Sequence, residues 1–242
     1  MMASLEALLW DVDGTLADTE QEGHRPAFNA AFAAMGCDWY WSPQDYDRLL
    51  RVGGGQERLR AWMATRDDWP AEARRDPDGW VRQLHARKTA LYRQRLLDTP
   101  LPLRPGVERL LKEAAAAGLR QAVVTTSSRA AVAGLLAGHS WLEPLFDLWV
   151  CGEDVTAKKP DPAAYRRALA DLGVSCGQAL ALEDSPAGLQ AARGAGLAVL
   201  ITRCGDAPGP LEGAAAVVDT LESGILGRPL GLDDLRHLHA QR

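Results

Sequence analysis

The sequence is poor in cysteine, and its few cysteines are far apart. Four occur in 242 residues, at Cys37, Cys151, Cys176 and Cys204, and no two of them form a C-x-x-C pair. This spacing favours neither a zinc knot nor a dithiol redox motif. We therefore expect reduced cysteines that are mostly packed in the interior.

The chain also lacks a long apolar run and an excess of basic residues. No stretch reaches the roughly 18 apolar residues that a membrane span needs, and no basic segment precedes a long apolar region near the first residue. The formal net charge is -5, which argues against nucleic-acid binding because affinity for phosphate backbones comes from clustered lysine and arginine. We expect a cytoplasmic monomer with no membrane or nucleic-acid partner.

The rest of the composition is ordinary for a folded globular protein. Hydrophobic residues make up 47% of the chain and charged residues 24%, which differs from the composition of disordered chains and disulfide scaffolds. A length of 242 residues suits one large domain, or a core with a smaller insertion.

Short apolar runs alternate with helical patterns over most of the chain. Runs typical of buried strands occupy residues 5–12, 120–127, 145–152, 178–184 and 197–203. Helical patterns occupy residues 105–118, 129–138, 161–173 and 185–196. This alternation predicts an α/β fold, a doubly wound parallel sheet with helices on both faces. Such sheets bind ligands beyond the carboxyl ends of their strands.

One helix-rich segment interrupts the alternation. Residues 18–97 contain no convincing strand and include a long helical pattern at 78–97, whose basic face we interpret as solvent-exposed. We interpret 18–97 as a small inserted α-helical cap, and residues 1–17 together with 98–242 as the core. A proline-rich stretch near the end of the insertion would serve as the second linker.

Two aspartates stand where the first predicted strand ends, in LLWDVDGTLADTE at residues 8–20. Asp11 and Asp13 are two positions apart and share a face of the strand, and Gly14 permits a tight turn that brings both carboxylates to one small volume. One carboxylate can then attack an electrophile while the other handles a proton. A calcium loop also uses D-x-D-G but needs a preceding helix, so a plain surface turn is the stronger alternative.

A second acidic pair, Glu183 and Asp184, ends another apolar strand. Two acidic clusters at one sheet edge repel each other unless a cation lies between them, so a hard metal ion such as Mg²⁺ explains them together. For Asp184 alone, capping of the following helix is an equally good interpretation. Together with Asp11 and Asp13, metal ligation is favoured.

Hydroxyl groups and a lysine lie near the ends of two further strands. Thr126 and Ser127 precede a helix and could cradle an anion there, although helix capping explains either residue taken alone. Lys159 precedes a proline-started helix, where a fixed cation would neutralise a phosphate and keep the carboxylates ionised. A solvated lysine is the alternative, which we assign to Lys158.

The order of these motifs, D-x-D-G-T, a hydroxyl-bearing strand end, K-P and E-D, resembles the haloacid dehalogenase-like (HAD) phosphohydrolase superfamily over nearly the whole chain. The resemblance implies that Asp11 is the nucleophile, which forms an aspartyl-phosphate, and that Asp13 is the general acid/base. The Mg²⁺ ligands that it implies are Asp11, Asp13 through its backbone carbonyl, Glu183 and Asp184. The phosphate-binding residues that it implies are Thr126, Ser127 and Lys159.

The insertion after the first motif resembles the small α-helical cap of β-phosphoglucomutase, phosphoglycolate phosphatase and the CbbY type. The stretches EQEGHRPAFN at 20–29 and GGGQER at 53–58 are most similar to the CbbY type. They imply that the substrate contacts cap residues Glu20, His24, Gly54, Gly55, Gln56 and Arg58. Gln56 stands where the family usually has lysine, which weakens the grip on a second phosphate. Without the resemblance, His24 is a polar surface group and the glycine run a flexible loop.

The resemblance implies a Mg²⁺-dependent phosphatase of small phosphorylated sugars, with a sugar bisphosphate such as xylulose 1,5-bisphosphate as substrate. A phosphosugar mutase of the β-phosphoglucomutase type and a phosphoglycolate phosphatase remain alternatives. A 2-haloacid dehalogenase is disfavoured because it needs neither Asp13, the E-D pair nor Mg²⁺. A noncatalytic phosphate-binding module is disfavoured by the intact Asp11 and Asp13.

Overall fold

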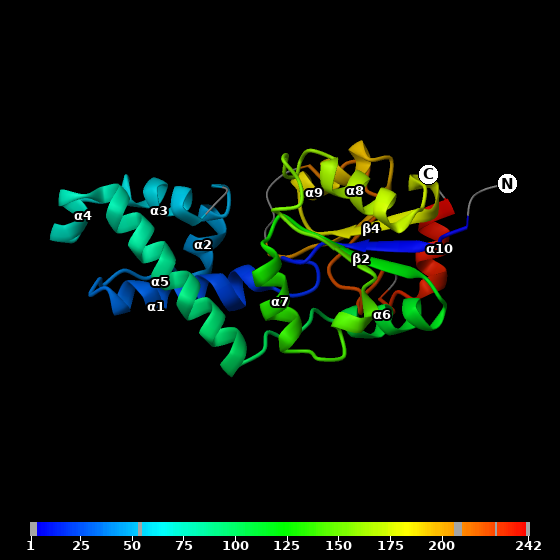
Figure 1. Ribbon diagram of the computed structural model, residues 1–242, viewed down its shortest axis with the longest axis horizontal. Helices are drawn as coiled ribbons and strands as arrows, with labels where there is room; N and C mark the ends of the chain where they lie inside the picture. The colour runs from blue at the N-terminus through cyan, green and yellow to red at the C-terminus, as the bar shows by residue number, and fades with distance from the viewer. Residues whose placement is uncertain (1–3, 53–54, 206–209, 226, 241–242) are drawn as a thin grey trace. The chain divides into compact units, whose positions relative to one another are not determined.

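The structure is a computed structural model that describes residues 4–52, 55–205, 210–225 and 227–240. It divides into two compact units (Figure 1). Unit 1 comprises Met1–Asp18 and Leu101–Arg242, and unit 2 comprises Thr19–Pro100. None of the described helices is long and apolar enough to span a membrane.

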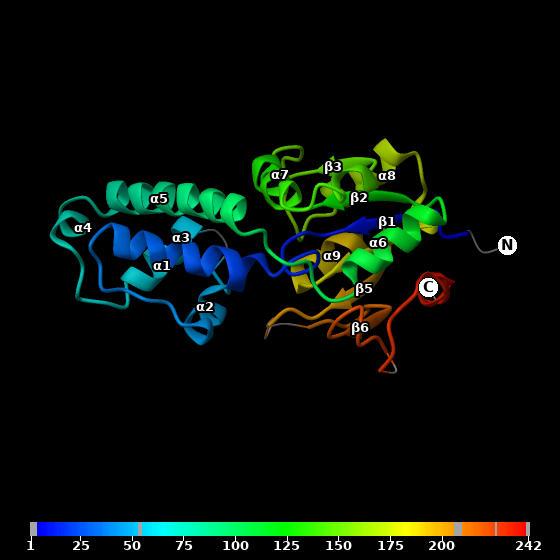
Figure 2. The ribbon, with the colours of Figure 1, turned by 90° about the horizontal axis from the view of Figure 1, so that it is seen from below.

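A six-stranded parallel sheet forms the centre of unit 1, in the order β3-β2-β1-β4-β5-β6. The strands are β1 (Ala7–Trp10), β2 (Arg120–Val124), β3 (Leu148–Val150), β4 (Ala179–Glu183), β5 (Ala198–Thr202) and β6 (Ala216–Val218). Figure 2 shows β3 at one edge of the sheet and β6 at the other. The central strands are buried along their length because their sequences are almost entirely apolar.

The register of the sheet determines where a ligand can bind. In β1, Ala7 lies opposite Arg120 of β2 on one side and Ala179 of β4 on the other. From β1 the chain builds the sheet outward through β2 and β3, and it then returns to build the other half from β4. The direction of winding therefore changes between β1 and β4, which is where doubly wound sheets bind ligands.

Helices cover both faces of the sheet. They are α6 (Val107–Ala116), α7 (Arg129–Ala137), α8 (Ala163–Leu172), α9 (Pro186–Gly194) and α10 (Leu232–Ala240), with short 3₁₀ turns at Glu143–Leu145 and Cys176–Gln178. Helices α8 and α9 pack together on one face, and α6 lies on the opposite face with α10 beside it (Figure 1). The predicted doubly wound α/β fold with a helical insertion is confirmed.

Unit 2 is helical throughout its described residues. A π-helical turn (Glu20–His24) leads into α1 (Arg25–Ala34), which is followed by α2 (Pro43–Leu49), α3 (Gly55–Met63), α4 (Ala71–Arg75) and α5 (Pro77–Asp98). Helix α1 packs along α5 over a core of aromatic side chains. Phe32 and Trp62 both meet the ring of Trp41 nearly edge-on, at 5.0 and 5.5 Å, a favoured geometry for aromatic pairs.

Helix α5 presents different residues to the core and to solvent. A repeat of four places Leu84, Lys88, Tyr92 and Leu96 on its buried face. Its arginines are exposed, as expected for the basic face of this segment. Lys88 is the exception, since its charged side chain lies within an apolar stripe.

Candidate active site

Three carboxylates meet beyond the carboxyl ends of β1 and β4. Asp11 directly follows β1, Glu183 is the last residue of β4, and Asp184 comes next. One carboxylate oxygen from each lies within 4.8 Å of the other two. The backbone brings them together because Asp11 N donates to Leu182 O at 3.0 Å, which extends the pairing of β1 with β4 past the end of β1.

A buried lysine joins the ends of three neighbouring strands. Lys159 Nζ donates to Asp11 Oδ1 at 2.6 Å, to Glu183 Oε1 at 2.5 Å and to the carbonyl oxygen of Val124, the last residue of β2, at 2.8 Å. Burial alone would lower the pKa of Lys159, but the carboxylates of Asp11 and Glu183 raise it above its usual value. Lys159 is therefore a fixed cation at the centre of the sheet edge, whereas Lys158 is exposed.

The carboxylate of Glu183 is fully buried and uses both of its oxygens. Oε1 accepts from Lys159 and from the hydroxyl of Tyr165, at 2.6 Å for the latter. Oε2 accepts from Asp184 N at 3.2 Å and from Ser185 Oγ at 3.3 Å. Glu183 thus holds Lys159 in place and shapes the turn that carries Asp184. Tyr165, on α8, was not among the predicted residues.

Asp184 packs directly against the backbone of Gly14. Gly14 has a φ of +80°, a conformation that favours glycine, and a Cβ at this position would overlap the Asp184 carboxylate. Ser185, and not Asp184, caps α9, since Ser185 Oγ accepts from Gly188 N at 3.1 Å. Helix capping, the alternative role considered for Asp184, is therefore the role of Ser185. The Asp184 carboxylate belongs to the acidic cluster.

The cluster holds more negative charge than one lysine balances. Burial raises the pKa of Asp11 to about 8, against the attraction of Lys159, and repulsion from Glu183 and Asp13 adds to the rise. Burial also raises the pKa of Asp184 well above its usual value, with further repulsion from Asp11 and Glu183. A divalent cation would relieve both effects, and carboxylate oxygens are the donors that Mg²⁺ prefers. The residues present therefore fit this ion.

The Asp13 carboxylate lies outside this group of three. Its Oδ2 accepts a hydrogen bond from the Ser127 hydroxyl, so Ser127 contacts the predicted acid/base directly. The prediction gave the backbone carbonyl of Asp13, and not its side chain, to the metal, and this remains a prediction. The phosphate-binding role of the Ser127 backbone likewise remains a prediction.

The hydroxyl-bearing residues that follow β2 differ in burial and in their hydrogen bonds. Thr126 is exposed, and Ser128 caps α7 by accepting from Ala131 N at 3.2 Å. Thr125 is buried, and its Oγ1 accepts from Ser127 N at 3.0 Å. Sequence reasoning missed Thr125 because the predicted strand ran to 127, whereas β2 ends at Val124 and so gives Thr125 the position that Asp11 has after β1.

In unit 2, two predicted substrate residues bind each other through a tyrosine. The hydroxyl of Tyr46 donates to Glu20 Oε2 at 2.6 Å, and Arg58 Nη1 donates to that hydroxyl at 2.7 Å and lies 3.5 Å from Glu20 Oε2. Arg58 is buried, and burial raises the pKa of Tyr46 far above its usual value. Tyr46 was not predicted, since one tyrosine in a helical pattern carries no distinguishing signal.

His24 contacts two side chains of α5. Its ring centroid lies 4.2 Å from that of Tyr92, and Lys88 Nζ lies 3.0 Å from His24 Nδ1. His24 ends the π-helical turn and is the N-cap residue of α1. Sequence reasoning did not single out Lys88 as a candidate site residue. Its position four residues from Leu84 and from Tyr92, within the apolar face of the helix, could have indicated a buried lysine.

The remaining predicted residues of unit 2 lie at the start of α3. Gly55 opens this helix, and a Cβ at this position would contact His85 at 2.6 Å, so the glycine makes room for a side chain of the same unit. Gln56 is half-buried on α3. Gly54 lies outside the described residues.

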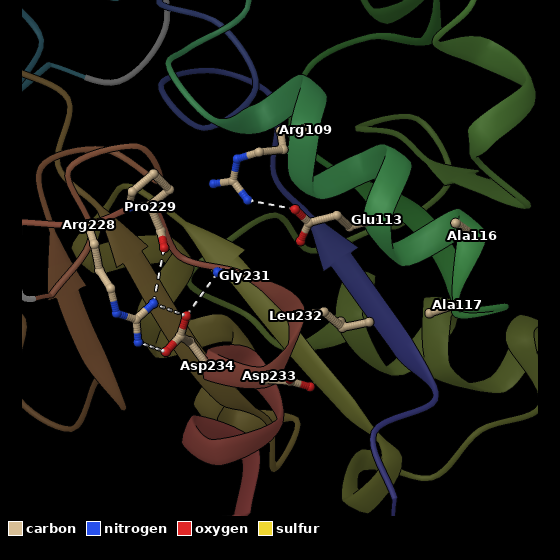
Figure 3. Close-up of a pocket in the computed structure, with 10 residues that line it drawn as sticks. All are labelled: Arg109, Glu113, Ala116, Ala117, Arg228, Pro229, Gly231, Leu232, Asp233 and Asp234. Carbon is tan, nitrogen blue, oxygen red and sulfur yellow. Dashed lines mark hydrogen bonds and ion pairs between the residues drawn. The ribbon is translucent and has the colours of Figure 1, made fainter.

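A separate cleft of about 830 Å³ lies between α6 and the segment that leads into α10 (Figure 3). Four of its charged groups pair with one another, Arg109 with Glu113 and Arg228 with Asp234, and Asp233 pairs with Arg236 outside the lining. The backbone N–H of Gly231 also donates to Asp234. None of the predicted site residues is among those that line it, so this cleft is distinct from the acidic cluster.

The acidic cluster lies at the carboxyl ends of the strands, which is where parallel α/β sheets carry their ligand sites. A model of the haloacid dehalogenase-like hydrolases matches residues 5–196. The chain belongs to this family, and the predictions of the family and of an enzyme of the phosphatase type are confirmed.

The chain is also similar to proteins named CbbY. It is 45% identical over 201 residues to protein CbbY of Rhodobacter capsulatus, across 82% of this chain and 85% of that protein. It is 41% identical over 238 residues to protein CbbY of Cereibacter sphaeroides, across 95% and 97%. Crystal structures of CbbY from Rhodobacter sphaeroides, one with phosphate and one with xylulose 1,5-bisphosphate, each match with a TM-score of 0.78 and 38% identity, across 96% of this chain and 99% of theirs.

Proposed function

We propose that this protein is a Mg²⁺-dependent phosphatase that hydrolyses small phosphorylated sugars through an aspartyl-phosphate on Asp11. The convergence of Asp11, Glu183 and Asp184 within 4.8 Å, with Lys159 bound to two of them, carries the proposal. This arrangement offers a nucleophilic carboxylate beside a cation and beside oxygen donors for a metal. Unit 1 would be the catalytic core and unit 2 the cap.

The proposed substrate class is a sugar bisphosphate. The similarity to a CbbY structure that contains xylulose 1,5-bisphosphate supports this choice. A bisphosphate presents one phosphoryl group for transfer and a second that a cap can recognise. Gln56 offers an amide where the related motif has a lysine, so we expect the cap to bind the second phosphate less tightly. A cytoplasmic monomer without nucleic-acid or membrane partners stays a prediction.

The proposed reaction has two steps on the side chains of unit 1. A carboxylate oxygen of Asp11 attacks phosphorus, and the bond to the sugar oxygen breaks as Asp13 gives that oxygen a proton. Water then attacks the phosphorus of the aspartyl-phosphate and gives a proton to Asp13, which releases phosphate and restores Asp11. Lys159 keeps one oxygen of Asp11 oriented throughout. Bound Mg²⁺ would neutralise charge on the transferred phosphoryl group.

The proposal is tested by measuring the release of inorganic phosphate, with Mg²⁺ and with EDTA, from a panel of sugar phosphates. The panel contains monophosphates and bisphosphates, including xylulose 1,5-bisphosphate. We expect phosphate release that needs Mg²⁺ and a higher kcat/KM for a bisphosphate than for the matched monophosphate. Phosphoglycolate belongs in the panel as the alternative substrate. Interconversion of sugar phosphates with little phosphate release would indicate a mutase, and no turnover of any ester would contradict an enzyme of this type.

A further inference from the structure

The guanidinium of Arg104 binds an unusual number of main-chain oxygens. Nη1 donates to the carbonyl of Gly14, and to both the carbonyl and the hydroxyl of Thr202, at 3.1 and 2.9 Å. Nη2 donates to the carbonyl of Arg203, and to that of Asp219 at 2.9 Å. The half-buried side chain therefore makes five hydrogen bonds, four of them to the backbone.

These acceptors come from three segments at one edge of the sheet. Gly14 lies in the loop after β1, Thr202 and Arg203 lie at the end of β5, and Asp219 follows β6. Strands β1 and β5 are not neighbours, because β4 lies between them. A planar fork of nitrogen donors can bridge such separated carbonyls, and the single nitrogen of a lysine cannot.

The backbone around Arg104 is tied to the same loop. Arg104 N donates to Leu16 O at 2.8 Å, and Leu103 forms an isolated antiparallel bridge with Ala17. Ala17 in turn accepts from Gly14 N at 2.8 Å. The segment that returns the chain from unit 2 is thus bound to the loop that carries Asp13 by main-chain bonds as well as by the guanidinium.

We propose that Arg104 is a positioning residue for Asp13, because it fixes the residue directly after the acid/base and so the direction in which the Asp13 carboxylate points. Ser127 Oγ donates a hydrogen bond to that carboxylate. A general acid must lie within hydrogen-bond reach of the leaving oxygen, and a misplacement of about 1 Å can cost about 100-fold in rate. The inference rests on the proposed function, since it assigns the proton transfer to Asp13.

Leaving groups of different basicity separate this role from a purely structural one. The value of kcat/KM covers the steps up to loss of the leaving group. A sugar oxygen needs a proton as it leaves, whereas p-nitrophenolate leaves without one. A displaced Asp13 therefore lowers kcat/KM for a sugar phosphate much more than for p-nitrophenyl phosphate, while a partly unfolded enzyme loses activity on both esters equally.

The test compares Arg104→Lys and Arg104→Gln with wild type on p-nitrophenyl phosphate and on the sugar phosphate that wild type hydrolyses fastest. For both variants we expect kcat/KM to fall by about 10- to 100-fold for the sugar phosphate and by at most about 3-fold for p-nitrophenyl phosphate. Arg109→Lys is the matched control, since Arg109 also binds main-chain oxygens, those of Leu221 and Leu230, in unit 1. This control should leave the ratio of the two kcat/KM values unchanged.

Three results have distinct meanings. If the Arg104→Lys protein retains the wild-type ratio, whether or not its Tm falls, the positioning role is wrong and the side chain is structural. If Arg104→Gln fails to fold, the ratio measured for Arg104→Lys decides alone. If wild type hydrolyses neither ester, the proposed function fails, and the positioning role of Arg104 fails with it; a changed or unchanged ratio in an active wild type tests Arg104 alone.

Discussion

Lys159 and Glu183 depend on each other at the centre of the site. Each is buried, and each is the partner that balances the charge of the other. A buried ion pair adds little stability over an apolar pair, but loss of one partner leaves a charge without compensation. The carboxylates at the ends of β1 and β4 explain how Lys159 occupies the interior, where a fixed cation was predicted and a solvated lysine was the alternative.

Removal of the Lys159 charge should therefore be costly. We expect Lys159→Met to lower the free energy of unfolding by about 3 kcal/mol in the metal-free protein, because Asp11 and Glu183 remain buried without their cation. Turnover should also fall by at least about 100-fold, since the cation no longer orients Asp11 or balances the phosphoryl charge. Urea unfolding and steady-state kinetics measure the two effects.

The exposed neighbour Lys158 provides the control. Lys158→Met should change neither quantity measurably, since surface charges contribute little. Equal effects of the two substitutions would show that Lys159 has no special role.

At the scale of elements, the sequence predicted five of the six strands and the strand ends that form the site, because apolar runs and helix punctuation are local signals; β6 was not predicted. These signals did not predict which of two neighbouring residues has a given role at a strand or helix end. Helix capping was the alternative role for Thr126 and Asp184, but Ser128 and Ser185 cap the two helices. Thr125 is the first residue after β2. Periodicity locates a strand end to within a few residues, but the direction of a side chain there changes with every residue.

At the junction between β4 and α9, the backbone of Gly188 lies close to the side chain of Glu183. In the first turn of α9, a Cβ at Gly188 would overlap the carboxylate of Glu183. We expect Gly188→Ala to lower the free energy of unfolding by about 1 to 3 kcal/mol, because overpacking outweighs the gain in helix propensity of up to about 1 kcal/mol. The displaced Glu183 should also loosen Lys159 and reduce kcat.

Gly194, in the same helix, provides the comparison for Gly188. A Cβ at Gly194 would lie 3.3 Å from the side chain of Pro162, a contact that a small shift relieves. Gly194→Ala should therefore change stability by less than Gly188→Ala and leave kcat unchanged. If the two substitutions give the same result in both measurements, the close approach at Glu183 has no consequence.

At the scale of the whole molecule, the acidic cluster links the stability of the fold to pH. Burial raises the pKa of Asp11 from 3.8 to about 8 in the folded, metal-free protein. Between these values the folded state binds a proton that the unfolded state has lost, so this group stabilises the fold fully below the lower pKa and contributes less as pH rises toward 8. In the proposed function, a bound divalent cation would take the place of the proton.

We therefore expect Mg²⁺ to raise Tm by more at pH 8 than at pH 5, and to release protons when it binds. Thermal unfolding with Mg²⁺ and with EDTA across this pH range measures the first effect. Asp11→Asn should reduce the pH dependence of this rise in Tm, because it removes one of the two carboxyl groups whose pKa is raised, and Asp184 remains. A rise in Tm that is the same at pH 5 and pH 8 would contradict a cluster that exchanges protons for metal.

Mass spectrometry of enzyme quenched in acid during turnover shows whether Asp11 carries the phosphoryl group. We expect the added mass of one phosphoryl group on the peptide that contains Asp11, formed with Mg²⁺, absent with EDTA, and absent in an Asp11→Asn protein that still unfolds cooperatively and has lost at least about 10⁴-fold in kcat. A phosphoryl group on another peptide, or full turnover by Asp11→Asn, would contradict this role of Asp11.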